Sequence, residues 1–477
     1  MYSDQDFKNM VTREKVKDTF ELYLAQKTDI LTEEPTIEVR EGLDGIGYQL
    51  FQKTLSHQID TIYKRIQRSN YFFYPLKEVE ISKDPLLTIV EAKKQGKTRT
   101  LSIAIIRDII TQKLLYDFIN PIAEKQFSEL SYISFAYRKN VNAQKAAQKV
   151  FHDIKDGYIY ALDADLKGFF DNIPHEQLFE QVKAFFPNMP GIQKLLYRFI
   201  HVDIGVIKKR EPKRKLIRVK RKKGIPQGGI ISGLLANIYL HQFDLWVIKN
   251  LGSHFDLRYT RYADDFVIVA KNKEDIITIK EECNNFLEDI SLILHPDPQK
   301  TKISTITKDK GLDFVGFKIS QNHIGIKEDN IKKFKYRIEK ILKSTDFSKQ
   351  KSLELLKLRC SYKFFGNDLK KFKCQTCGEF EQARNWMKFF LVVTDTKQLK
   401  QLDSWIYKSI NYYYFKNIGI RLNKNALKEI EFPSLELLYY TYRKQLNKNT
   451  SYCVCNAIDK SIVPTRNPYE ELFSSYS

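Results

Sequence analysis

The chain of 477 residues is long enough for roughly two to four domains with hydrophobic cores of their own. Its 79 Lys and Arg residues against 58 Asp and Glu residues give a net charge of +21, which favours nucleic acid as a partner and leaves a basic protein without that role as the alternative. It contains no apolar run long enough to cross a membrane and does not start like a signal peptide, so we expect a cytoplasmic protein without a membrane partner.

The N-terminal hundred residues predict a helical segment and then a hairpin. Residues 1–65 are charged and place apolar side chains at helical spacing, which indicates an extension that packs on the rest of the protein or holds RNA. Segments 79–82 and 93–103 predict a β-hairpin whose basic turn includes Lys97 and Arg99. A solvated charged turn is the plain alternative for this turn.

Two further stretches precede the middle of the chain. Residues 158–173 predict a strand that ends in Asp163 and Asp165, followed by a glycine turn into a helix. Residues 224–240 predict a Pro/Gly loop, containing Gln227, that opens an amphipathic helix.

Asp264 and Asp265 lie between two runs of strand-favouring residues, 254–259 and 266–269, which predicts that both acids sit at the tip of a β-hairpin. Adjacent carboxylates repel each other unless a cation neutralises them or one takes up a proton. A bound divalent metal explains the pair, because carboxylate oxygens are its natural ligands. The alternative is an Asp-Asp turn on a solvated loop.

These three acidic and Pro/Gly stretches, in this order, resemble the palm motifs of reverse transcriptases, most closely those of the bacterial group II intron type. The resemblance covers roughly residues 66–320 and, more weakly, 320–425. It implies an α+β right-hand polymerase: fingers and palm, whose antiparallel sheet carries the acidic hairpin, a helical thumb, and helical terminal extensions. The expected domains are 1–65 (N-terminal extension), 66–320 (fingers and palm), 321–425 (thumb) and 426–477 (C-terminal extension).

The resemblance assigns the metal ligands and catalytic acids to Asp165, Asp264 and Asp265, with Asp163 ranked behind Asp165. They would hold two Mg²⁺ ions, or Mn²⁺ in their place, about 4 Å apart. These ions would activate the primer 3′-oxygen and stabilise the departing pyrophosphate during RNA-templated DNA synthesis.

The resemblance also implies a nucleotide site. Arg99 and, less strongly, Lys97 would hold the triphosphate. Phe170 would lie under the sugar and exclude a 2′-hydroxyl, Gln227 would hydrogen-bond near the nucleotide, and Lys300 would donate a proton to pyrophosphate. Without the motif around it, Phe170 would be taken for a core aromatic residue.

Two basic elements are expected to contact the nucleic acid. Arg138, in a segment similar to the family's template guide, is a candidate for a template phosphate, and a capping or surface role is its alternative. Residues 203–223 are unusually basic, and because they directly precede the Gln227 loop we expect them along the duplex groove. The residues proposed there are Lys220, Arg221 and Lys222.

The chain departs from the family's usual pattern at several positions. Thr100, Ala104 and Gly233 stand where prolines are usual, Ile109 stands where a basic residue is usual, and about two extra residues precede Lys300. With these differences we still expect the reverse-transcriptase fold. They distinguish the chain from the typical intron-encoded members of the family.

The remaining segments predict helices and few special sites. Residues 331–338, 385–390 and 402–406 resemble a helical thumb. Beyond residue 425 we find neither a maturase DNA-binding segment nor a His-Asn-His nuclease. Six cysteines do not make a disulfide framework, and we expect free thiols rather than zinc at the pairs Cys374/Cys377 and Cys453/Cys455.

Three biological settings stay open. The first is a defence-associated enzyme that copies a dedicated noncoding RNA; the others are a group II intron maturase and a retron-type enzyme. The expected partners are an RNA template, a DNA or RNA primer and deoxynucleoside triphosphates, with a second copy of the chain or another protein as further partners.

Overall fold

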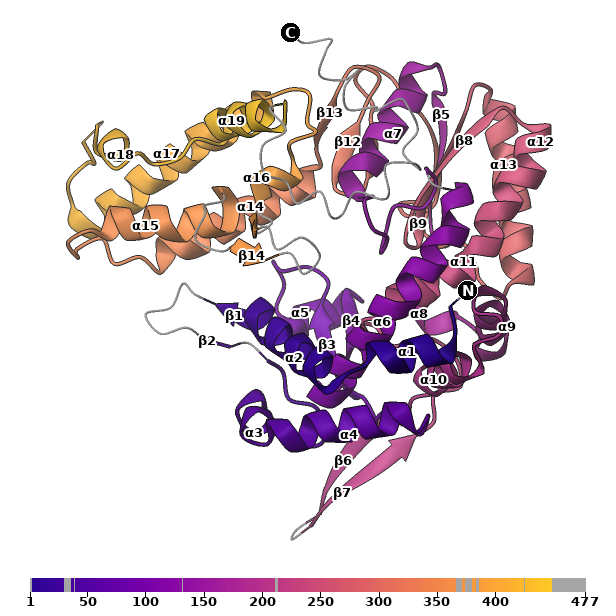
Figure 1. Cartoon of the computed structure of the whole chain (residues 1–477). Helices are drawn as coiled ribbons and strands as arrows, with labels where there is room; N and C mark the ends of the chain where they lie inside the picture. Colours follow the sequence, from indigo (N-terminus) through magenta and orange to yellow (C-terminus); the bar gives the residue numbers. More distant parts are fainter. Residues whose placement is uncertain are drawn as a thin grey trace. The chain divides into compact units, whose positions relative to one another are not determined.

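A computed structural model describes residues 2–29, 36–37, 39–130, 132–210, 213–365, 371–373, 380–382, 386–423 and 425–447 (Figure 1). The chain forms two compact units, the first from Met1–Arg138 and Asp156–Thr305, the second from Lys139–Lys155 and Ile306–Ser477. The domain boundaries expected from the sequence stay predictions. The two cysteine pairs proposed as thiols lie outside the described residues, and the two described cysteines, Cys283 and Cys360, are free and buried.

The first unit mixes helices with four described strand groupings, the central sheet and three two-stranded pairs, in agreement with the α+β expectation. Its helices are α1 (Asp4–Met10), α2 (Arg13–Lys27), α3 (Tyr48–Lys53), α4 (Leu55–Gln67), α5 (Ile89–Lys94), α6 (Ile106–Phe127), the 3₁₀ turn η1 (Ser128–Leu130), α8 (Phe169–Asn172), α9 (His175–Phe185), α10 (Pro190–Ile200), α11 (Ser232–Trp246), the π turn η2 (Val247–Leu251), α12 (Gly252–His254) and α13 (Lys273–Asp289). Its strands are β1 (Thr28–Asp29), β2 (Thr36–Ile37), β3 (Lys77–Ser82), β4 (Thr98–Ile103), β5 (Tyr160–Asp165), β6 (Ile204–Arg210), β7 (Lys213–Val219), β8 (Leu257–Tyr262), β9 (Asp265–Ala270) and β10 (Lys302–Thr305).

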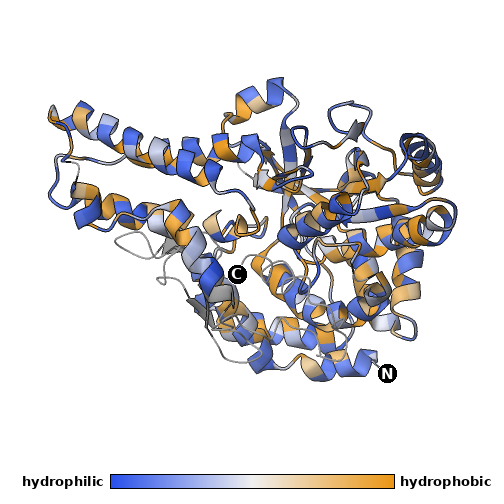
Figure 2. Cartoon of the chain, turned by 90° about the horizontal axis from the view of Figure 1, so that it is seen from above, coloured by the Kyte–Doolittle hydropathy of each residue, from blue (hydrophilic) through white to orange (hydrophobic). Residues whose placement is uncertain are grey.

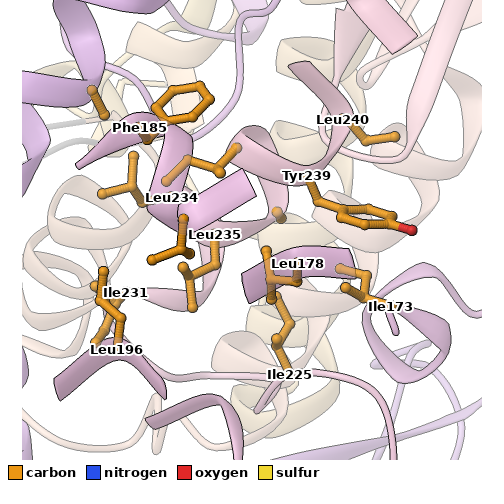
Figure 3. Close-up of a cluster of buried hydrophobic side chains, with 14 of the residues drawn as sticks. Ile173, Leu178, Phe185, Leu196, Ile225, Ile231, Leu234, Leu235, Tyr239 and Leu240 are labelled. Atoms are coloured by element: carbon orange, nitrogen blue, oxygen red, sulfur yellow. The ribbon is translucent and has the colours of Figure 1, made fainter. Parts of the chain in front are cut away.

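The central sheet has the strand order β10-β5-β9-β8, and every neighbouring pair is antiparallel. The interiors of β5 and β9 are buried, as their short apolar runs require. Helix α11 is buried around most of its circumference, not amphipathic as the sequence suggested, because it lies in a core with α9 and α10. Figure 3 shows this core, with Leu234 and Leu235 of α11 near Leu178 of α9.

Besides the short β1–β2 pair, two hairpins of the first unit lie outside the central sheet. Strands β3 and β4 pair antiparallel from Lys77 opposite Ile103 to Ser82 opposite Thr98. The expected hairpin is present, but residues 93–94 end helix α5 instead of starting a strand, because Thr88 and Glu91 form a capping box that begins the helix. The basic segment also forms a hairpin, β6–β7, an element that the sequence analysis did not predict.

The second unit contains the helices α7 (Ala143–Lys155), α14 (Glu328–Lys343), α15 (Ser352–Cys360), the π turn η3 (Ser361–Phe365), α16 (Trp386–Phe389), α17 (Lys397–Ile418), α18 (Ala426–Glu429) and α19 (Leu435–Asn447). Its strands are β11 (Leu312–Phe314), β12 (Phe317–Ile319), β13 (Ile324–Ile326), β14 (Lys371–Lys373) and β15 (Phe380–Gln382). The long helices alternate hydrophilic and hydrophobic stretches in Figure 2, and α14 buries one apolar face, as its spacing predicts. No described helix is both long and apolar enough to cross a membrane.

Candidate active site

The three expected catalytic acids lie at one end of the central sheet. Strands β5 and β9 pair so that Asp165 is directly opposite Asp265. Asp264 occupies the turn between β8 and β9, and its carbonyl oxygen accepts a hydrogen bond from the backbone N–H of Leu166 at 3.2 Å. The register of β5 and β9 therefore brings Asp165 and Asp265 together, although they lie a hundred residues apart in the sequence.

These carboxylates destabilise one another's charge. Partial burial raises the pKa of Asp264, and the neighbouring Asp165 raises it further. Burial raises the pKa of Asp265 well above its ordinary value, and Asp163, Asp165 and Asp264 add to this effect. Such a cluster favours a cation that restores the charged forms.

The donor set fits a divalent cation that completes its shell with water and substrate phosphate. Within the described ranges, no three His, Cys, Asp or Glu side chains converge into a ready-made metal site. Hard carboxylate oxygens nevertheless match Mg²⁺, which characteristically binds through one or two carboxylates and keeps other ligands from water and phosphate. Asp264 and Asp265, with Asp165 across the sheet, provide these oxygens.

Two lysines next to the acids come from the segment that leads into β10. Lys300 Nζ lies 2.9 Å from Asp165 Oδ2, and this hydrogen bond raises the pKa of Lys300. Lys302 Nζ lies 3.2 Å from Asp163 Oδ2, in a strand where Lys302 is opposite Asp163. The structure therefore brings Lys300 to the acids despite the extra residues before it, and it adds Lys302, which the sequence did not single out.

A buried network holds the hairpin that carries Asp264. Arg261 of β8 is 1% exposed and pairs with Asp244 of α11, which is 2% exposed. Its Nη1 also donates to Asn237 Oδ1 at 3.1 Å and to the carbonyl oxygen of Ala263 at 3.0 Å. Ala263 has a left-handed backbone with φ of 59°. Arg261 therefore secures the strained residue directly before Asp264, a role that only the fold reveals.

Tyr137 and Phe170 form an aromatic wall beside the acids. Their ring centroids are 6.3 Å apart in a T-shaped arrangement. Burial raises the pKa of Tyr137, Asp264 raises it further, and the charge of Arg99 lowers it. Tyr137 therefore packs against Phe170 and feels the charges of both Asp264 and Arg99.

The β3–β4 hairpin contributes cations to this region. The charge of Lys83 lowers the pKa of Asp264, an influence that the sequence did not indicate. Lys97 is exposed directly before β4, and its carbonyl oxygen accepts a hydrogen bond from the N–H of Lys83 at 2.8 Å. Arg99 is exposed on β4.

Gln227 lies at the wall of a polar cavity. Its Nε2 donates to Asp171 Oδ1 at 3.0 Å, and its carbonyl oxygen accepts from the N–H of Ser102 at 2.8 Å. The following Gly228 has φ of 101°, which favours glycine. The cavity has a volume of about 180 Å³ and also includes Arg221 in its lining.

Two of the expected nucleic-acid contacts are turned inward. Arg138 has a 5% exposed side chain that pairs with Glu124 at 3.1 Å and donates to the carbonyl oxygen of Ser134. Arg221 has a 9% exposed side chain, 3.5 Å from Glu78, and its burial lowers its pKa. Neither guanidinium is presented to a strand in solvent, whereas Lys220 and Lys222 are exposed.

Residues 91–319 match the family described as reverse transcriptase (RNA-dependent DNA polymerase). The chain is 27% identical over 314 residues to Protein YkfC of Escherichia coli (strain K12), covering 58% of this chain and 75% of that protein. It is 25% identical over 307 residues to the group II intron-encoded protein LtrA of Lactococcus lactis subsp. cremoris, covering 52% of this chain and 47% of that protein. A telomerase structure from Candida albicans aligns with 12% identity and a TM-score of 0.42, over 89% of this chain and 73% of that one.

Proposed function

We propose that the chain is an RNA-directed DNA polymerase, as its match to the reverse transcriptase family over residues 91–319 supports, and that it extends a primer with Asp165, Asp264 and Asp265 as its metal-binding acids. The observation that carries the proposal is the register that sets Asp165 opposite Asp265, with Asp264 in the adjoining turn. Mg²⁺ or Mn²⁺ held there would increase the acidity of the primer 3′-hydroxyl and neutralise charge on the phosphates.

The side chains around the acids support distinct roles. Arg99, which is exposed on β4, and Lys83, whose charge lowers the pKa of Asp264, would neutralise the triphosphate. Lys300, whose Nζ donates to Asp165, would give a proton to the departing pyrophosphate. Phe170 would stack under the deoxyribose and leave no room for a 2′-hydroxyl, and Gln227 would bind the nucleotide at the polar cavity. We keep Lys97 as a second triphosphate contact.

We further propose that the template is a dedicated noncoding RNA and that the enzyme serves in antiphage defence. The departures from the intron-type pattern, such as Gly233 and Ile109, support a specialised enzyme, and the net charge of +21 supports an RNA partner. The similarity to LtrA favours a second candidate, a maturase that acts on intron RNA. A retron-type enzyme is a third candidate.

Sequencing of the nucleic acids that copurify with the protein from its native context distinguishes these functions. We expect one small RNA and complementary DNA, and the double variant Asp264→Asn/Asp265→Asn should retain the RNA and lose the DNA. An acid pair in the first turn of α13, Glu274→Gln/Asp275→Asn, is the matched control and should retain both. Intron RNA without DNA, unchanged by the double variant, would instead indicate a maturase.

A further inference from the structure

The β6–β7 hairpin is a basic ribbon at a distance from the acids. Residues 204–219, which form the two strands and their turn, contain seven Lys or Arg residues and one acidic residue, Glu211. The side chains of Lys208, Lys215 and Arg218 are exposed. In Figure 1 the ribbon projects below α4, while β8 and β9 lie on the other side of the same unit. The ribbon therefore presents charge away from the acidic hairpin.

The base of the ribbon is fixed to the β3–β4 hairpin. The N–H of Leu76, directly before β3, donates to the carbonyl oxygen of Asp203 at 2.8 Å, and the N–H of Gly205 donates back to the carbonyl oxygen of Leu76 at 2.8 Å. A side chain at Gly205 would clash with Leu43 and crowd Pro75. Because its base is anchored, the ribbon has a fixed orientation. Its charged residues are therefore preorganised before a partner binds.

The amino-acid composition of the ribbon indicates which class of nucleic acid it would bind. Proteins that bind single strands without base specificity stack the bases on aromatic side chains. Residues 204–223 contain no aromatic residue. Double-helical RNA is instead recognised by its shape and its phosphates, which need cations on a rigid scaffold. Seven-residue strands give the ribbon a length of roughly 20 Å, over which a duplex presents about twice the charge of one strand.

We propose that the β6–β7 ribbon binds a double-helical segment of the RNA that carries the template, at a distance from the site of synthesis. This inference rests on the proposed function, because the enzyme is assigned a structured RNA partner there. The ribbon would anchor the folded part of the RNA by phosphate contacts and leave its single-stranded part for copying.

The test compares full-length protein with the variant Lys208→Gln/Lys215→Gln/Arg218→Gln. Binding to a blunt RNA duplex of about 20 base pairs and to a single strand of the same length is measured over a range of salt concentrations. We expect the variant to bind the duplex about tenfold or more weakly, with a salt slope reduced by about 2 to 3, and to bind the single strand nearly as before. Thermal unfolding verifies that the variant is folded.

The matched control removes three lysines from η2 and α13, Lys249→Gln/Lys273→Gln/Lys280→Gln, and should leave duplex binding unchanged. Nucleotide incorporation on a short unstructured template should also stay unchanged in the ribbon variant. If incorporation is absent from the wild-type protein while duplex binding depends on the ribbon, the proposed function fails and the ribbon assignment holds.

Two results would overturn the proposal. One is duplex binding that the ribbon substitutions do not weaken, which would assign the ribbon to another partner, such as a protein that covers the exposed Val206 and Val219. The other is an equal loss of single-strand and duplex binding, which would make the ribbon a general polyanion surface.

Discussion

Gly233 shows how a departure from the family's pattern is accommodated by one neighbouring side chain. A Cβ at this position would clash with the ring of Tyr137. Tyr137 packs its ring against Phe170, and it lies close to Asp264. The absence of a side chain at Gly233 therefore leaves the space that Tyr137 fills beside the proposed nucleotide site.

We expect Gly233→Ala to displace Tyr137 and to lower kcat/KM for nucleotide incorporation by about tenfold, because small misplacements beside a reacting group are costly. Steady-state incorporation on a primed RNA template measures the effect. The double variant Gly233→Ala/Tyr137→Ser should recover part of the loss. A single variant with unchanged kcat/KM would show that the placement of Tyr137 does not matter for synthesis.

Asp165, Asp264 and Asp265 could be predicted from the sequence because each lies inside a short local motif. The burial of the Arg138 side chain could not be predicted in this way, because its partner Glu124 belongs to another element. Lys83 and Arg261 carry no local pattern and are linked to the hairpin only by the folded arrangement.

At the scale of elements, the β8–β9 hairpin depends on the ion pair between Arg261 and Asp244. We expect Arg261→Met to lower the free energy of unfolding by about 3 to 5 kcal/mol, because it leaves Asp244 buried without its partner. We also expect a higher Mg²⁺ concentration for half-maximal synthesis, because the carbonyl of Ala263 loses its donor. Urea unfolding and a Mg²⁺ titration measure the two effects.

Arg258→Met on the same strand is the control for this prediction. Arg258 is exposed and pairs with Asp256 at 3.5 Å, so its loss should cost less than about 1 kcal/mol and leave the Mg²⁺ dependence unchanged. Equal effects of the two substitutions would contradict a special role for Arg261.

The first turn of α6 contains a pH-sensitive contact. Asp108 is buried, accepts hydrogen bonds from the Tyr71 hydroxyl at 2.6 Å and the Tyr74 N–H at 2.7 Å, and has a pKa raised by burial to about 7. Between pH 3.8 and 7 the folded state therefore holds a proton that the unfolded state has lost. The free energy of unfolding should fall as pH rises through this window.

Urea unfolding at pH 5 and pH 7 tests this contact. From linkage, Asp108 should account for a decrease on the order of 2 kcal/mol between the two pH values. Asp108→Asn should lower stability at both values and flatten the dependence, whereas Asp18→Asn on the exposed face of α2 should leave it as in the wild type. A dependence that persists in Asp108→Asn would assign it to another group.

The sequence predicted the type of most elements but not their ends or partners. Residues 93–94 looked like part of a basic turn, and the capping box at Thr88 was the local signal for a helix. The β6–β7 ribbon escaped prediction because its lysines and arginines mask the apolar residues that alternate within it, such as Val206 and Ile217.

At the scale of the whole molecule, the second unit takes one helix from the first third of the chain. Helix α7 buries an apolar face that includes Ala147 and Val150, and it contacts β12 and β13. The sequence could not identify the strands that cover this face, because they come much later in the chain.

A chain ended after Thr305 should therefore expose the apolar face of α7. We expect less soluble protein and stronger binding of a hydrophobic dye than for a chain ended after Lys343, which retains β11–β13 and α14. Expression followed by dye fluorescence makes the comparison. Equal dye binding by the two truncated chains would show that α7 finds cover within the first unit.

The late arrival of these strands has a consequence for synthesis on the ribosome. Helix α7 is complete at Lys155, whereas its covering strands end at Ile326. At typical elongation rates of 5–20 residues per second, α7 waits roughly 10 to 30 s for its partners. During that interval a newly made apolar surface is open to chaperones and to other nascent chains, so the yield of native enzyme in the cell should depend on how fast this stretch of message is translated.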